Sequence, residues 1–500
     1  MNPLSKSKLI AFRQCTKRLW LEVHRRELLT DSDATKAKYN AGNIVGELAR
    51  KLYDTNGQGY LIETKQVEFA DCFNKTVEVM AKSIPIFEAG FKTDDALAFA
   101  DILLPLKKRG EQEWKMIEVK SSTSVKQYHR DDVAIQSYVA RSAGANIVQA
   151  SLLHIDTSWT YPGKNDYQGL LKEVDLADDA FGREEEVEAW IQQAHQVIKK
   201  KKEPKVTTGD HCNSPFECGF SAYCQSQVPQ IDYPVQWLPR IQTTSLKAHL
   251  EKQKVLSMED VPDTLLNEKQ LRVKHHTLQN QVYFDAQGAA DALAPHKLPA
   301  YFLDFETIQF AVPIWKGTKP YQQIPFQYSV HRLNRRGALE HQAFLDLSGK
   351  DPSKAFAEKL IDDCGSRGPI FVYNAGFEKT RISELAQRFP RLSSNLLAIN
   401  DRIVDLWPIA KEHFYHPSQK GSWSIKAVLP AIAPDMSYEN LAGVQNGGDA
   451  MAAFLKAISV DTEPAHKAQI EEQLLAYCGL DTFAMVRLWA FFSGNEKFAA

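Results

Sequence analysis

Three cysteines within thirteen residues constrain this chain more than any other feature of its sequence. They lie in Cys212-Asn-Ser-Pro-Phe-Glu-Cys218-Gly-Phe-Ser-Ala-Tyr-Cys224, and the whole chain has only seven cysteines. A fourth, Cys15, lies near the start of the chain among basic and aromatic residues. Clustered thiols in a reducing compartment are typically metal ligands rather than disulfides. If Cys15 is the fourth ligand, a metal site joins the beginning of a domain to its end, and the residues between form one folded unit.

The spacing of these cysteines leaves two kinds of metal site open. Structural zinc sites usually pair ligands across roughly two to four residues, whereas both gaps in the 212–224 segment contain five residues. An iron–sulfur cluster held by four thiolates is the alternative. The remaining cysteines, Cys72, Cys364 and Cys478, are isolated in the sequence and are expected in the hydrophobic core.

Length and charge set broad limits. At roughly 100 to 200 residues per domain, a chain of 500 residues is expected to contain several domains. The formal net charge of -2 gives no overall attraction to polyanions, so a surface that binds nucleic acid must be local. The N-terminal segment has no apolar signal region, and no stretch approaches the about 20 apolar residues of a membrane span. We therefore expect a cytoplasmic protein without membrane contact.

A pair of acidic residues and a lysine form the first candidate site. Residues 96–106 and 114–120 are expected to be strands, joined by a turn at 107–110. Because side chains alternate along a strand, Glu118 and Lys120 point to one face, and a hairpin would bring Asp101 beside them. Two carboxylates can hold a divalent cation, and an ammonium group can orient the attacking water.

These residues resemble the PD-(D/E)XK nucleases of the RecB type, including the CRISPR-associated and AddB-like branches that carry an iron–sulfur cluster. The likeness comprises Asp101, Glu118-Val-Lys120, the following helix with Gln136, and the flanking cysteines. It implies that Asp101 and Glu118 bind Mg²⁺ or Mn²⁺ and that Lys120 is catalytic. Gln136 would position the substrate or Lys120. The resemblance also favours a structural 4Fe-4S cluster, and it assigns four ligands, namely Cys15, Cys212, Cys218 and Cys224.

The chain departs from that family at two positions. Relatives often have a histidine ligand after a glycine on an early helix, whereas here Gly46 is followed by Glu47. Either Glu47 replaces this metal ligand or the ligand is absent. The tyrosine of the usual Q-x-x-x-Y motif is displaced, because Tyr138 follows Gln136 by two residues.

The second candidate site lies in the C-terminal half. The segment 301–307 has the pattern of a buried strand with Asp304 and Glu306 on one face. Two carboxylates are costly to bury unless a cation lies between them. Further strands are expected at 325–333, 338–346 and 369–373, and helices at 352–364 and 464–492. Tyr477 and Asp481 are four residues apart on the last helix and share a face.

This half resembles the DEDD exonucleases of the DnaQ-like, ribonuclease-H-like group. The motifs are Asp304-Phe-Glu306, Asn374-Ala-Gly-Phe-Glu378 and Tyr477 with Asp481, which is the tyrosine subtype. The resemblance implies that the acids hold two metal ions and that Tyr477 orients the water. Glu378 replaces the usual aspartate, and Asp405 is a reserve ligand.

The expected architecture is therefore α/β. A PD-(D/E)XK restriction-endonuclease-like domain occupies 1–228, a helical connector 229–297, and a ribonuclease-H-like mixed-sheet domain 298–500. The expected function is metal-dependent hydrolysis of DNA, single-stranded or with free ends, by two sites, the second working from 3' to 5'. A role in DNA repair or defence against foreign DNA is implied by association only. The alternatives are a nucleic-acid-binding protein with one or both sites inactive, and an RNA-trimming exonuclease.

Overall fold

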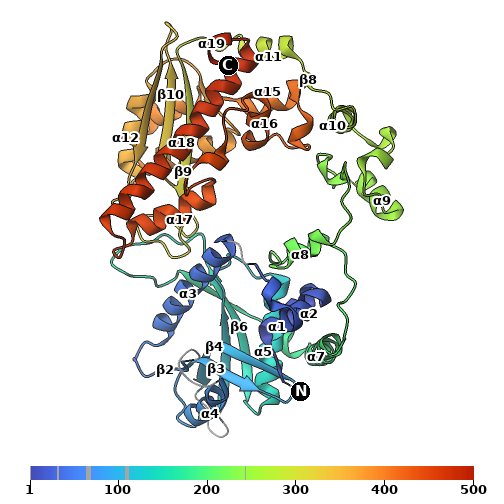
Figure 1. Cartoon of the computed structure of the whole chain (residues 1–500). Coiled ribbons are helices and arrows are strands. Elements are labelled where there is room, and N and C mark those ends of the chain that lie inside the picture. The colour runs from blue at the N-terminus through green and yellow to red at the C-terminus, as the bar shows by residue number, and fades with distance from the viewer. Residues whose placement is uncertain (1, 31–32, 64–68, 107–111, 243, 500) are drawn as a thin grey trace. The chain divides into compact units, whose positions relative to one another are not determined.

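The computed structural model describes residues 2–30, 33–63, 69–106, 112–242 and 244–499 (Figure 1). The chain forms two compact units, both mixed α/β. Unit 1 comprises Met1–Pro229 and Gln309–Gln322, and unit 2 comprises Gln230–Ile308 and Gln323–Ala500. The division differs from the expected one in two respects. The expected connector 229–297 falls almost entirely within unit 2, and residues 309–322 belong to unit 1 because they pack into its apolar interior.

Unit 1 is built on a seven-stranded mixed sheet. Its order is β2-β3-β4-β5-β6-β7, with β1 paired parallel to β4. The strands are β1 (Leu4–Ser5), β2 (Tyr60–Leu61), β3 (Ile86–Lys92), β4 (Ala96–Leu106), β5 (Glu113–Val119), β6 (Ile147–Ile155) and β7 (Leu171–Asp175). The β3-β4-β5 part is antiparallel, as the sequence predicted for β4 and β5, and β6 lies parallel to β5. The turn expected at 107–110 lies outside the described residues.

The helices of unit 1 bury their apolar faces against this sheet. They are α1 (Lys6–Gln14), α2 (Thr16–His24), α3 (Asp33–Tyr53), α4 (Phe69–Met80), α5 (Gln127–Ser142), α6 (Ala177–Phe181), α7 (Glu184–Ile198) and α8 (Ser221–Ser226). Helix α5 is the most central, because Val133, Ile135 and Val139 are fully buried in the main core. Helix α3 covers a second apolar cluster, where Ala49 packs with Ile117.

Residues 309–322 complete unit 1, although they follow β9 in the sequence. Ala311 packs in an apolar cluster with Val45 and Ile155. The backbone N–H of Tyr161 donates to the carbonyl oxygen of Thr318 at 2.9 Å. The Tyr321 hydroxyl donates to the carbonyl oxygen of Ser121. The segment is therefore part of the interior of unit 1.

Unit 2 is built on a five-stranded mixed sheet in the order β11-β10-β9-β12-β13. The strands are β9 (Ala300–Ile308), β10 (Ile324–Leu333), β11 (Leu339–Leu345), β12 (Ile370–Val372) and β13 (Ile403–Asp405). The first three are antiparallel, and β12 lies parallel to β9 and β13. A small second sheet pairs β8 (Tyr283–Phe284) with β14 (Phe414–Tyr415).

Helices cover both faces of this sheet. Leu303 and Phe305 face α12 (Ser353–Cys364), α13 (Gly376–Arg388) and α14 (Ser393–Asn400), because they share one core cluster. Helix α18 (Pro464–Ser493) packs on β9 and β10 (Figure 1). Alternation along β9 directs the side chains of Asp304 and Glu306 to the face away from α12. The other helices are α9 (Thr244–Gln253), α10 (Glu268–Leu278), α11 (Ala286–Leu293), α15 (Leu406–His413), α16 (Ile425–Ile432), α17 (Gly447–Ile458) and α19 (Glu496–Ala499).

Helix α18 qualifies the expectation that no stretch approaches a membrane span. Within the described part of the chain it is the one helix whose length and composition would allow it to cross a membrane. In the structure 67 % of its most apolar window is buried inside the protein. Many of its apolar residues are buried within unit 2.

Candidate functional site

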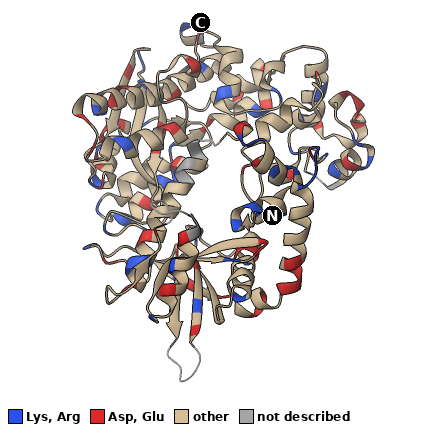
Figure 2. Ribbon diagram, turned by 60° about the horizontal axis from the view of Figure 1, so that its bottom comes forward, with Lys and Arg blue, Asp and Glu red and all other residues tan. Residues whose placement is uncertain are grey.

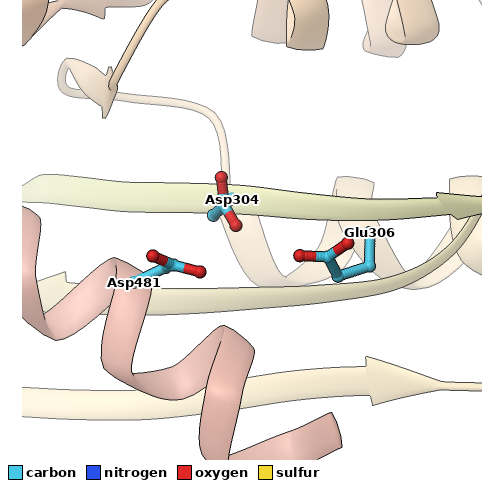
Figure 3. Close-up of side chains that lie close together, drawn as sticks. All are labelled: Asp304, Glu306 and Asp481. Carbon is cyan, nitrogen blue, oxygen red and sulfur yellow. The ribbon is translucent and has the colours of Figure 1, made fainter. Parts of the chain in front are cut away.

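Three acidic side chains converge in unit 2. Asp304 and Glu306 come from β9, and Asp481 comes from α18 (Figure 3). Each contributes a carboxylate oxygen, and these oxygens all lie within 4.8 Å of one another. Glu306 and Asp481 are only 7 % and 6 % exposed. Carboxylate oxygens in this arrangement are the ligands that Mg²⁺ and Mn²⁺ prefer.

Burial and mutual repulsion raise the pKa values of these three acids. Burial raises the pKa of Glu306 to about 8, and the charge of Asp481 adds to the effect. Burial also raises the pKa of Asp481 to about 6, although a hydrogen bond from Tyr438 acts in the opposite direction. The pKa of Asp304 lies well above its usual range because of burial and then the neighbouring carboxylates. A bound cation would relieve this repulsion.

Tyr438 and Lys426 complete this site, and the sequence did not reveal either. The Tyr438 hydroxyl donates to Asp481 Oδ1 at 2.5 Å, and its ring centroid lies 6.2 Å from that of Tyr477. Lys426 Nζ lies 5.0 Å and 5.4 Å from the ring centroids of Tyr438 and Tyr477. Lys426 is exposed, and its Nζ donates to the carbonyl oxygen of Gln445 at 2.6 Å. Neither residue lies in a recognisable motif.

Glu378 lies near the three acids without joining their group. It is in the first turn of α13, is 3 % exposed, and adds its charge to the environment of Asp304. Burial raises its pKa to about 8. Its Oε2 has no hydrogen-bond partner among the described residues. Asp405 accepts hydrogen bonds from the backbone N–H groups of Asn374, Ala375 and Trp407, so it fixes the starts of two helices.

The four motif residues of unit 1 also lie together. Glu118 is 1 % exposed, and Lys120 Nζ donates to its Oε1 at 2.5 Å. Gln136 Nε2 donates to Oε2 of the same carboxylate at 2.5 Å. The backbone N–H of Val119 donates to Asp101 Oδ2 at 2.6 Å, which joins β4 to β5 at this point.

Lys6 and Asp132 form ion pairs with these side chains. Lys6 Nζ lies 2.9 Å from Glu118 Oε1 and 3.1 Å from Asp132 Oδ1. Asp132 Oδ2 lies 2.5 Å from Lys120 Nζ. The spacing of Asp132 and Gln136, four residues apart on α5, is a sequence signal that could have identified Asp132. Lys6 had no such signal.

The charged side chains of the unit 1 cluster shift one another's pKa values. Burial raises the pKa of Asp101 well above its usual range, and Glu118 adds to the effect. Burial alone would raise the pKa of Asp132 too, but Lys120 and Lys6 hold it well below its usual range. Glu88 contributes a further negative charge near Asp101, from a position on β3 with φ 58°.

Among the described residues, no contact joins Glu47 to this cluster, and its role as a ligand stays a prediction. Val45 and Ala49, two residues before and after it on α3, are fully buried, whereas Glu47 is exposed. An α-helix turns by about 100° per residue, so Glu47 points to the opposite side of α3 from these two residues. Among the described side chains, Glu88 is the additional acid near Asp101.

The four candidate cysteine ligands line one small cavity. Cys15 stands at the junction of α1 and α2, and the backbone N–H of Cys218 donates to the carbonyl oxygen of Cys212 at 2.8 Å. Over the described residues, the cysteine sulfur atoms form no group of three within 4.8 Å of one another. Tetrahedral zinc with Zn–S bonds of about 2.3 Å would hold its sulfur atoms about 3.8 Å apart. The other three cysteines are buried, as expected.

Comparison with known proteins gives a domain of unknown function and two uncharacterized relatives. Residues 301–424 match the model of a domain of unknown function (DUF2779), and this range contains Asp304, Glu306 and Glu378 but not Asp481. The chain is 26 % identical over 213 residues to the MG366 homolog, an uncharacterized protein of Mycoplasma pneumoniae. The match covers 38 % of this chain and 31 % of that protein. It is 25 % identical over 179 residues to the uncharacterized protein UU173 of Ureaplasma parvum. This match covers 31 % of this chain and 26 % of that protein. The chain thus spans less than a third of the length of these relatives.

Proposed function

We propose that the protein is a metal-dependent nuclease with two hydrolytic sites, one in each unit. The observation that carries the proposal is the group formed by Asp304, Glu306 and Asp481 beside Tyr477. Bound divalent cations would supply the activated water and stabilise the leaving oxygen. The mixed β11-β10-β9-β12-β13 sheet supports a ribonuclease-H-like fold for unit 2.

The residues of unit 2 have separable tasks in this proposal. Asp304, Glu306 and Asp481 would hold the cations, and Glu378 would add a carboxylate from α13. Tyr477 would orient the attacking water through its phenol. Lys426, exposed at the edge of the acidic group, would contact a phosphate oxygen of the substrate, because an ammonium group is a point donor to phosphate.

The site of unit 1 would work as a PD-(D/E)XK nuclease. Asp101 and Glu118 would hold Mg²⁺ or Mn²⁺, and Lys120 would orient water or stabilise developing negative charge. The β3-β4-β5-β6 part of the sheet with α3 and α5 supports this fold. Gln136 would hold Glu118 through its hydrogen bond to Oε2.

We further propose a structural 4Fe-4S cluster bound by Cys15, Cys212, Cys218 and Cys224. Their shared cavity supports a common ligand. Their sulfur atoms are spaced more widely than a single zinc ion requires. A tetranuclear cluster places its own iron and sulfide between the thiolates and so needs the wider spacing.

The proposed substrate is DNA that is single-stranded or has free ends, and unit 2 would degrade it from 3' to 5'. Lys and Arg are interspersed with Asp and Glu over each unit, which agrees with a local contact surface (Figure 2). A cytoplasmic location and a role in DNA repair or in defence against foreign DNA belong to the same proposal and rest on the family resemblances.

Digestion of end-labelled oligonucleotides tests the function. Wild type, Lys120→Ala and Asp304→Ala are incubated with single- and double-stranded DNA and matched RNA in Mn²⁺. We expect each substitution to remove one of two product patterns, with losses of about 100-fold or more because a group acting on the reacting phosphate is lost. Lys172→Ala and Asp401→Ala, at exposed positions in units 1 and 2, are the matched controls.

Other outcomes of this assay contradict the proposal in defined ways. Binding that weakens with salt, without cleavage, would identify a nucleic-acid-binding protein. Cleavage of RNA alone would identify an RNA-trimming enzyme. Loss of both product patterns in one single variant would contradict two independent sites.

A further inference from the structure

Lys6, Asp132, Glu118 and Lys120 form a closed ring of charges in unit 1. Lys6 and Lys120 both donate to Glu118 Oε1, at 2.9 Å and 2.5 Å. The same two ammonium groups lie 3.1 Å and 2.5 Å from the two oxygens of Asp132. Gln136 Nε2 joins the two carboxylates from another side, at 2.5 Å from Glu118 and 3.2 Å from Asp132. Each cation is therefore shared by two acids.

We infer that Lys6 and Asp132 are positioning residues of the unit 1 site, which set the direction of Lys120 and the cation affinity of Glu118. The inference rests on the proposed function of that site. A lysine ammonium held by a single carboxylate can rotate about it, whereas one held by two is fixed in direction. Asp132 supplies the second contact for Lys120, and Lys6 supplies the second contact for Glu118 Oε1.

The location of Lys6 supports a role beyond packing. It is the first residue of α1, and its helix is capped by Ser5, whose side chain accepts from the backbone N–H of Lys8. A positive charge at a helix N-terminus is unfavourable because the helix dipole is positive there. The two carboxylates compensate for this position. Lys6 is thus held at the helix N-terminus by Glu118, which is proposed to bind the metal, and by Asp132.

The net charge of the ring predicts opposite effects for the two residues. Glu118 and Asp132 carry two formal negative charges, and Lys6 and Lys120 carry two positive charges, so the ring is neutral. Removing the charge of Lys6 makes the site more negative and frees one contact at Glu118 Oε1. Removing the charge of Asp132 leaves the ring with one positive charge. A divalent cation should therefore bind the first variant more tightly and the second more weakly.

Mn²⁺ binding to the full chain tests the inference. The background is Asp304→Ala with Asp481→Ala, so that unit 2 contributes no binding, and affinity is measured by calorimetry with Mn²⁺ alone. We expect Lys6→Met to bind about tenfold more tightly and Asp132→Asn about tenfold more weakly, which is the size of effect that one close charge has on a neighbouring site. Lys8→Met, at a half-buried position of the same helix, and Asp178→Asn, at an exposed position, should leave the affinity unchanged.

Cleavage in the same background provides the second measurement. We expect both Lys6→Met and Asp132→Asn to lower the single-turnover rate by about tenfold or more, and Lys6→Arg to retain more activity than Lys6→Met because it keeps the charge. Affinity changes of the same sign, or unchanged affinity with a lower melting temperature only, would show that the ring is purely structural and would overturn the inference. So would a background protein that binds no Mn²⁺. A background protein that binds Mn²⁺ without cleaving would contradict the nuclease proposal, while the affinities would still decide this inference.

Discussion

Individual buried carboxyl groups determine how unit 2 responds to pH. Glu306 and Glu378 are both nearly inaccessible, and burial raises the pKa of each from 4.5 to about 8. A raised pKa means that the folded state favours the protonated acid more than the unfolded state does. These groups therefore stabilise the fold at low pH, and this contribution is lost as the pH rises through about 8.

The melting temperature of metal-depleted protein should follow this linkage. We expect the transition of unit 2 to fall by about 10 °C between about pH 6 and about pH 9 in EDTA, because each pKa unit corresponds to about 1.4 kcal/mol of unfolding free energy. Mn²⁺ should restore most of the loss at high pH, since it favours the ionised carboxylates. Differential scanning calorimetry measures both effects.

The Glu306→Gln variant provides the control for this prediction. It keeps the shape of the side chain and removes one group that must ionise. Its melting temperature in EDTA should depend less steeply on pH than that of the wild type. An equal slope in both proteins would show that Glu306 ionises freely in the folded state.

Among single residues, those within motifs could be predicted and their partners could not. Spacing along one strand or helix brings Glu118 close to Lys120 and Tyr477 close to Asp481. Lys6 and Tyr438 reach the same sites from 112 and 43 residues away, respectively. No local periodicity encodes such distant contacts.

Helix α1 and the cysteine segment are the elements that the proposed cluster would join. Gln14, the last residue of α1, donates from Nε2 to the carbonyl oxygens of His211 and Phe216, each at 2.7 Å. The backbone of the 212–224 segment is thereby tied to α1 beside Cys15. Loss of one thiolate should loosen both elements together.

Cys218→Ser should remove this link. Protein purified without oxygen should be brown and contain about four iron atoms per chain, and the variant should lose most of its iron. The melting temperature of unit 1 should fall while that of unit 2 does not change. Cys364→Ser, in the core of unit 2, is the matched control and should keep its iron. Stoichiometric zinc without iron in the wild type would contradict the cluster.

Several predicted elements are confirmed because their patterns are strong and local. The strands expected at 96–106, 325–333 and 338–346 appear as β4, β10 and β11, and the helix expected at 464–492 appears as α18. Apolar alternation and punctuating glycine or proline residues define such elements. Segment 309–322 contains Pro313, Gly317 and Pro320 but forms no helix or strand, and its assignment to unit 1 depends on contacts with residues far earlier in the chain.

At the scale of the whole molecule, unit 1 depends on a segment that lies within the sequence of unit 2. We expect Ala311→Asp in the full chain to destabilise unit 1 by about 3 kcal/mol, because a charge would be buried among Val45, Ile155 and Leu170. Hydrogen–deuterium exchange should then quicken in β6 and α3. Lys319→Asp, at an exposed position of the same segment, should have no such effect. Faster exchange confined to β10 and β11 would contradict the assignment.

The insertion of residues 309–322 has a topological consequence. The chain passes between the units at 229–230, at 308–309 and again at 322–323, so three covalent connections join them. A protease that cuts only the first of these would release neither half. Likewise, no single recombination point in the gene separates all of unit 1 from all of unit 2.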